Sequence, residues 1–165
     1  MRTITLLLLL CFFIPTSCKK ETTKSGKEIE IYLLKSYIRE TTGSISNVSL
    51  ELEDSALVKY EDILWYDSDT HIFKVSSKTA NWLNDVPPHG KAFAIAINKD
   101  IIYTGYFWSS LSSGICNWVV INPLNNGNGE LSVDLGYHQG LEQVIPDNRN
   151  DNRLLEILRL DNKLK

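Results

Sequence analysis

The sequence predicts an α+β fold, with a single, mostly antiparallel sheet, a short central helix and a C-terminal helix packed on that sheet. Several stretches alternate apolar and polar residues with the period of two that strands require, and two others place apolar residues three and four positions apart, as helices do. Stretches rich in Gly, Asn and Asp separate these segments where turns are needed. No segment repeats another, and the 147 residues that follow residue 18 have the usual size of one domain.

The first strands are predicted at residues 28–34, 47–53 and 70–76. In the first stretch, three aliphatic residues alternate with more polar ones: Ile29, Ile31 and Leu33. That alternation is typical of a strand with one buried face. The second stretch repeats it with aliphatic residues of its own, Val48, Leu50 and Leu52.

A short helix is predicted at residues 76–86, because a serine or threonine cap precedes apolar residues at helical spacing. The apolar residues are Ala80, Trp82, Leu83 and Val86. Pro87 and Pro88 end this helix, because proline has no amide hydrogen to donate. A second helix is predicted within residues 147–165, where capping residues precede a set of core-facing side chains, Leu154, Leu155, Ile157 and Leu158.

The clearest strand is residues 92–98, because both of its faces are apolar. One face carries three large residues, Phe93, Ile95 and Ile97. The other carries three alanines, Ala92, Ala94 and Ala96. Such a strand is expected in the centre of a sheet, and the alanines let another element pack closely. A short turn then leads into residues 101–108 as a hairpin, and residues 116–122 and 129–135 supply two more strands.

The chain opens with a segment that predicts export. After Arg2, the apolar run 4–14 is too short for a membrane span, which needs about 20 residues, and suits a secretory signal peptide, which needs about 7 to 15. Ser17 and Cys18 then resemble the lipobox of bacterial lipoproteins, although Pro15 stands where that family usually has Leu.

The resemblance implies cleavage before Cys18, lipid on its sulfur, and anchoring in the cell envelope. Because Lys19 rather than Asp follows, it implies delivery to the outer membrane, facing either the periplasm or the outside. An ordinary secreted protein cut near Ser17 is the alternative. We therefore expect a signal peptide at residues 1–18, a flexible polar tether at 19–27 and one domain at 28–165.

Composition limits the possible partners. Beyond residue 18 the chain has 16 basic and 20 acidic side chains, a formal charge of −4, with no basic cluster after the tether, so nucleic acid is not an expected partner. Cys116 has no partner for an internal disulfide once Cys11 and Cys18 are assigned to the leader and the lipid, and its apolar neighbours predict a core position. No phosphate-binding glycine loop or Cys-x-x-Cys pair is present, and no cofactor is expected.

The order of elements across residues 71–121 is strand, short helix, glycine-lysine, apolar strand, tight turn and strand. This order resembles the periplasmic head subdomain of the protein-export component SecD/SecDF. The same segment, with "YDSDTH" before it and "DNRNDNR" near the end, is also similar to small uncharacterised Bacteroidota lipoproteins. The resemblance implies a fold that contacts other chains, and it transfers no catalytic residue.

Two kinds of chemistry are considered from the residues. Asp67, Asp69 and His71 alternate in "YDSDTH", so a regular strand would place them on one face as metal ligands, whereas a local turn would use the Asp side chains to bond backbone amides. A serine hydrolase would need one of the serines of "SSLSSG" beside His89 or His138. That stretch lacks the strand, sharp turn and flanking glycines of a nucleophile elbow.

Four aromatic residues in "YTGYFW" define a candidate binding site. Alternation places Tyr103 and Phe107 on one face of a strand and Tyr106 and Trp108 on the other. We expect the first pair in the core and the second pair exposed beside Ser109 and Ser110, unless other elements cover both faces.

The sequence therefore predicts a non-catalytic envelope lipoprotein that binds a peptide, protein or envelope polymer. The alternative is a metal-dependent or serine hydrolase of the envelope, and a purely structural envelope component is a third possibility.

Overall fold

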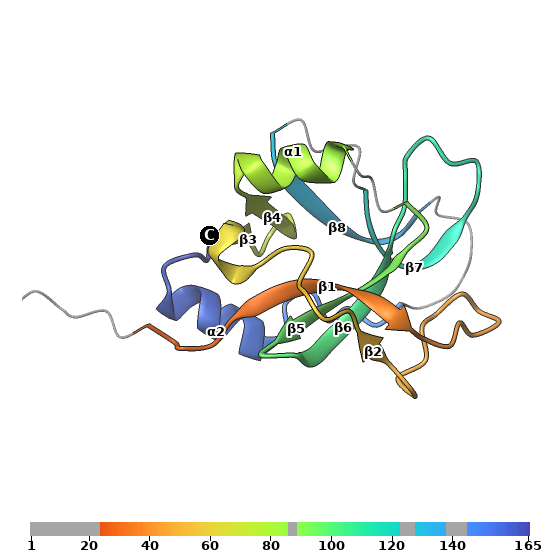
Figure 1. Cartoon of the computed structure of the whole chain (residues 1–165), viewed down its shortest axis with the longest axis horizontal. Coiled ribbons are helices and arrows are strands. Elements are labelled where there is room, and N and C mark those ends of the chain that lie inside the picture. Colours follow the sequence, from red (N-terminus) through yellow and green to blue (C-terminus); the bar gives the residue numbers. More distant parts are fainter. Residues whose placement is uncertain (1–23, 86–88, 123–127, 138–144) are drawn as a thin grey trace, which may run out of the picture.

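The computed structural model describes residues 24–85, 89–122, 128–137 and 145–165 (Figure 1). Its strands are β1 (Ile29–Ser36), β2 (Glu51–Leu52), β3 (Ile63–Asp67), β4 (Ile72–Val75), β5 (Ala92–Ile97), β6 (Asp100–Phe107), β7 (Cys116–Ile121) and β8 (Glu130–Tyr137). Its helices are a short 3-10 turn, η1 (Tyr60–Asp62), and two α-helices, α1 (Ser77–Asp85) and α2 (Asn152–Leu160). The predicted α+β class, with a short central helix and a C-terminal helix, is confirmed.

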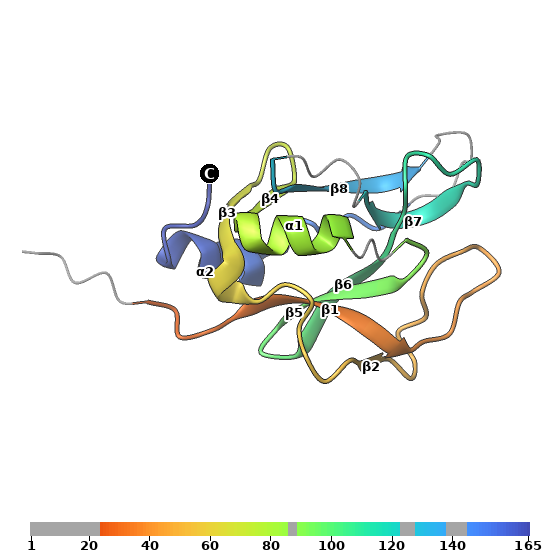
Figure 2. The same ribbon diagram turned by 45° about the horizontal axis from the view of Figure 1, so that its top comes forward.

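The strands of the described residues form one eight-stranded sheet in the order β2-β1-β5-β6-β7-β8-β4-β3. All neighbouring pairs are antiparallel except β6 and β7. That parallel contact has only two residue pairs, Tyr106 with Val120 and Phe107 with Ile121, so the two halves of the sheet are joined over a short length. Figures 1 and 2 show the two halves diverging on either side of this contact.

The main core lies between the halves of the sheet and the two α-helices. Its buried side chains come from β1 and β3 to β8, together with Ala80 and Leu83 of α1 and Leu154, Ile157 and Leu158 of α2. α2 therefore packs on the sheet as predicted, and its Leu155 is only half buried. None of the helices in the described ranges is long and apolar enough to cross a bilayer.

The hairpin of β5 and β6 follows its sequence pattern. Ala92, Ala94 and Ala96 are buried on one face of β5, and the three large residues are buried on the other. The connecting residues Asn98 and Lys99 both have positive φ angles, 49° and 71°, which is the geometry of a type I′ hairpin turn.

The strand predicted at residues 47–53 is wrong for most of its length. Only Glu51–Leu52 pairs with β1, and Val48 is 65% exposed. The reason is local, because Ser49 has a φ of 62°, which an extended strand does not tolerate. Residues of segment 37–50 instead lie over the outer face of β1, β5 and β6, where Tyr37, Ile45 and Leu50 form a second apolar cluster with the alanine face.

Local hydrogen bonds begin the two α-helices. The Oγ of Ser76 accepts from the amide of Thr79 at 3.3 Å, and Asp151 accepts from the amide of Arg153 at 2.9 Å. In α1, Ala80 and Leu83 face the core as predicted, but Trp82 is 45% exposed. The sequence placed the end of this helix at Val86, Pro87 and Pro88. These three residues lie outside the described ranges.

The two ends of the described chain are held together. Asp161, just after α2, accepts hydrogen bonds from the amide and the hydroxyl of Ser25, both at 2.8 Å, and from the hydroxyl of Tyr60 at 2.7 Å. Lys163 and Lys165 then pair by their backbones with Tyr66 of the edge strand β3. The first described residues are therefore fixed beside the C-terminal end of α2.

Candidate functional site

The residues "YDSDTH" form a turn between β3 and β4. The Oδ1 atom of Asp67 accepts from the amides of Asp69 and Thr70, both at 3.0 Å, and the amide of Thr70 contributes most to holding the pKa of the Asp67 carboxyl below its ordinary value. His71 adopts a positive φ of 55° and lies 3.2 Å from the hydroxyl of Tyr66 through Nδ1. Within the described ranges no three His, Cys, Asp or Glu side chains are grouped to hold a metal ion. The Asp67 carboxylate therefore accepts backbone amides of the turn, as the turn interpretation of this stretch predicts.

Ser109 and His89 meet through the backbone and not as a nucleophile and its base. Nδ1 of His89 accepts the backbone amide of Ser109 at 2.9 Å, while the Oγ of Ser109 accepts the amide of Leu111 at 3.1 Å. A serine nucleophile needs its hydroxyl to donate to the imidazole, and this pair connects through the backbone instead. His138, the other histidine considered, lies outside the described residues.

The aromatic residues of β6 separate onto two faces as predicted. Tyr103 and Phe107 are buried in the main core, and Gly105 between them leaves room for the ring of Phe93. The expectation that Tyr106 is exposed is wrong, because its side chain is only 3% exposed. Segment 37–50 covers this face, and Tyr37 meets the Tyr106 ring edge-on with 6.1 Å between ring centroids.

Trp108 is half buried and closes a loop. Its Nε1 donates to the carbonyl oxygen of Gly114 at 3.3 Å, and its ring lies 5.4 Å from the His89 ring. Gly114 packs under the indole, where an added Cβ would lie 3.2 Å from Trp108 Cζ2. The Trp108 side chain therefore packs within the loop, against Gly114 and His89, and is not a freely exposed aromatic surface.

The loop between β6 and β7, residues 108–115, is called the distal loop below. Ser109 and Ser112 stabilise it by accepting the amides of Leu111 and Gly114, each at 3.1 Å, and the carbonyl oxygen of Ser110 accepts the hydroxyl of Tyr137 at 2.7 Å. The serines thus hold the backbone in one shape.

Two aliphatic side chains project from the distal loop. Leu111 is 85% exposed and Ile115 is 54% exposed. Holding an exposed leucine on an ordered backbone reduces the entropy that a partner must overcome on binding. Sequence reasoning selected the aromatic residues and missed both aliphatic ones. The available signal was a leucine between two serine pairs, where no strand or helix period gives it a buried face.

The surroundings of the distal loop are uncharged in sequence. Residues 101–129 contain no Asp, Glu, Lys or Arg, although charged residues make up 22% of the whole chain. The centres of protein interfaces are depleted in charge in the same way. Figures 1 and 2 place the distal loop at one end of the molecule and the first described residues at the opposite end.

Cys116, next to the distal loop, is a core residue. It is 2% exposed, and burial raises the pKa of its thiol. A neutral, buried thiol is a poor nucleophile, so the cysteine adds no chemistry to this site.

Comparison of the chain with protein families, curated proteins and solved structures finds no match. The resemblance to the SecD/SecDF head and to small envelope lipoproteins therefore stays a prediction.

Proposed function

We propose that the protein is a lipid-anchored binding module of the bacterial cell envelope, and that its distal loop holds a protein partner without catalysis. The observation that carries the proposal is the exposure of Leu111, which is 85% exposed on a loop whose backbone accepts and donates several hydrogen bonds. The lipid anchor is proposed at Cys18, on the resemblance of Ser17 and Cys18 to a lipobox. In the turn after β3, Asp67 accepts the amide of Asp69, and in the distal loop the amide of Ser109 donates to His89.

The arrangement favours a protein over a membrane as the occupant of the distal loop. Residues 101–129 supply no cation to meet lipid phosphates. The cations near the base of the loop belong to other elements: Lys91, whose carbonyl oxygen accepts the amide of Phe107, and Arg39, which lies 5.6 Å from the centre of the Tyr106 ring. A neutral rim of serines around one aliphatic side chain instead suits an apolar pocket bordered by polar groups on a partner.

Site-specific photo-crosslinking in intact cells tests this proposal. A diazirine amino acid replaces Leu111 in one strain and, as the control, Leu64 of β3, which is 50% exposed on a different element. The proposal predicts one discrete protein adduct from position 111 and none of that mass from position 64. Lipid adducts at position 111, or the same adducts from both positions, would contradict it.

A further inference from the structure

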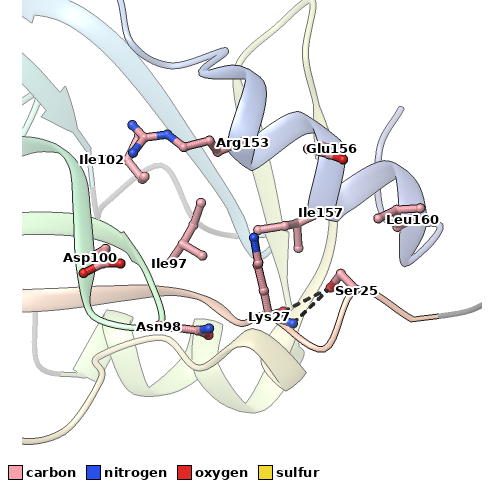
Figure 3. A pocket seen from close by; sticks show the side chains of 10 residues that line it. All are labelled: Ser25, Lys27, Ile97, Asn98, Asp100, Ile102, Arg153, Glu156, Ile157 and Leu160. Carbon is pink, nitrogen blue, oxygen red and sulfur yellow. Dashed lines mark hydrogen bonds between the residues drawn. The ribbon is translucent and has the colours of Figure 1, made fainter.

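A groove of about 300 Å³ opens between α2, the hairpin of β5 and β6, and the first described residues (Figure 3). Four aliphatic side chains line it: Ile97, Ile102, Ile157 and Leu160. Ile97 and Ile157 belong to the main core, whereas Leu160 is 45% exposed. The groove therefore has an aliphatic floor that is continuous with the core and open to solvent at one side.

Charges of both signs border this floor. Lys27 and Arg153 supply the cations, and Asp100 and Glu156 supply the carboxylates. Figure 3 shows Lys27 reaching from the N-terminal segment toward α2. Arg153 is held by Asp151 through two hydrogen bonds, of 2.9 Å from Nε and 2.8 Å from Nη2. A border with both signs next to an aliphatic floor matches a ligand that is itself zwitterionic and amphiphilic.

The groove lies where the tether enters the domain. Ser25 lines it and is fixed there by its two hydrogen bonds to Asp161. Cys18 precedes Ser25 by seven positions, and an extended chain spans at most about 3.3 to 3.6 Å per residue, so the reach is about 25 Å. This step rests on the proposed lipid anchor: with Cys18 in a bilayer, the groove stays within that distance of the lipid surface.

We propose that this groove binds a zwitterionic phospholipid of the anchoring membrane. The glycerol and the first methylenes lie on the aliphatic floor, the phosphate meets Lys27, and the ammonium group meets one of the two border carboxylates, Asp100 or Glu156, which lie on opposite sides of the groove in Figure 3. The domain would then rest on the membrane through this face, with the distal loop pointing away from it.

Photo-crosslinking to vesicles tests the inference on the full-length, lipidated protein. A diazirine amino acid replaces Leu160 in one sample and Leu111 in another, and each protein is reconstituted into phosphatidylethanolamine vesicles. We expect at least about five times more phospholipid adduct from position 160 than from position 111. Equal labelling from the two positions would overturn the groove as a lipid site.

Two further arms separate the chemistry from simple proximity. Vesicles of phosphatidylglycerol, which lacks the ammonium group, should give at least about threefold less adduct at position 160, and Lys27→Glu should lower the adduct similarly in phosphatidylethanolamine. If neither phosphatidylglycerol nor Lys27→Glu changes the adduct yield, the groove touches lipid without recognising its headgroup. That result would overturn the inference.

Flotation of the same vesicles distinguishes this inference from the proposed anchor. Protein that floats without a lipid adduct at position 160 overturns the groove and leaves the anchor standing. Protein that fails to float overturns the anchor and, with it, the groove as a site for the anchoring membrane. A protein adduct at position 160 would identify the groove as a protein interface instead.

Discussion

Gly105 shows how closely the two halves of the sheet approach at a single residue. A Cβ added there would lie 2.5 Å from Cζ of Phe93 and 2.6 Å from the carbonyl oxygen of Val119, which is backbone and cannot rotate away. Gly105→Ala should therefore lower the free energy of unfolding by about 1 to 3 kcal/mol, as overpacking does. Denaturant unfolding measures this, with the exposed Ser110→Ala as the control. Equal stability of the two variants would show that β6 and β7 are less closely packed at Gly105 than the structure indicates.

Asp147 gives the protein an acid-dependent contribution to stability. Its carboxylate pairs with Arg149 at 2.8 Å, and the hydrogen bonds from Arg149 lower its pKa to about 2. Because the pKa in the unfolded chain is about 3.9, this contribution is present above that pH and lost as the pH falls toward 2. Asp147→Asn should be less stable at pH 6 and lose less between pH 4 and pH 2. Thermal melts across this range measure the effect. If the melting temperature fell with pH equally in the wild type and in Asp147→Asn, the pairing of Asp147 with Arg149 would not contribute to acid stability.

At the scale of elements, the first turn of α1 depends on one serine. The Oγ of Ser76 accepts the amide of Thr79 and donates to Asp62 at 2.8 Å, so it links the helix to η1. Ser76→Ala should cost about 1 kcal/mol, the usual loss for a helix cap. Ser77→Ala, one residue later, is the matched control and should cost much less. Denaturant midpoints measure both, and a larger loss from Ser77→Ala would mean that the cap is misplaced.

Elements with strong local patterns were predictable from the sequence, and long-range contacts were not. The hairpin of β5 and β6 followed from alternation on both faces and from a turn that suits its residues. The burial of Tyr106 did not follow, because segment 37–50, more than fifty residues earlier, covers it. The exposure of Leu111 depends on serine side chains bonding to the loop backbone, and no hydrophobic period carries that information.

For the molecule as a whole, the proposed envelope function requires an acylated Cys18. Radiolabelled palmitate should enter the wild-type protein and not Cys18→Ala, and the labelled protein should stay with membranes in high salt because each buried methylene contributes about 0.8 kcal/mol. Cys11→Ala is the control and should be labelled like the wild type. Equal labelling of Cys18→Ala and the wild type would remove the anchor from the account.

The most direct test of the central claim is the affinity of the distal loop for the protein that crosslinks to position 111. Leu111→Ser should weaken binding at least tenfold, a loss of about 1.4 kcal/mol, because an exposed side chain that anchors a partner loses its apolar contact. Leu64→Ser, also an exposed leucine, should bind like the wild type, and both variants should keep the wild-type melting temperature. Calorimetric titration measures the three dissociation constants. We expect weaker binding for Leu111→Ser alone, and equal affinity of all three proteins would rule out the distal loop as the binding surface.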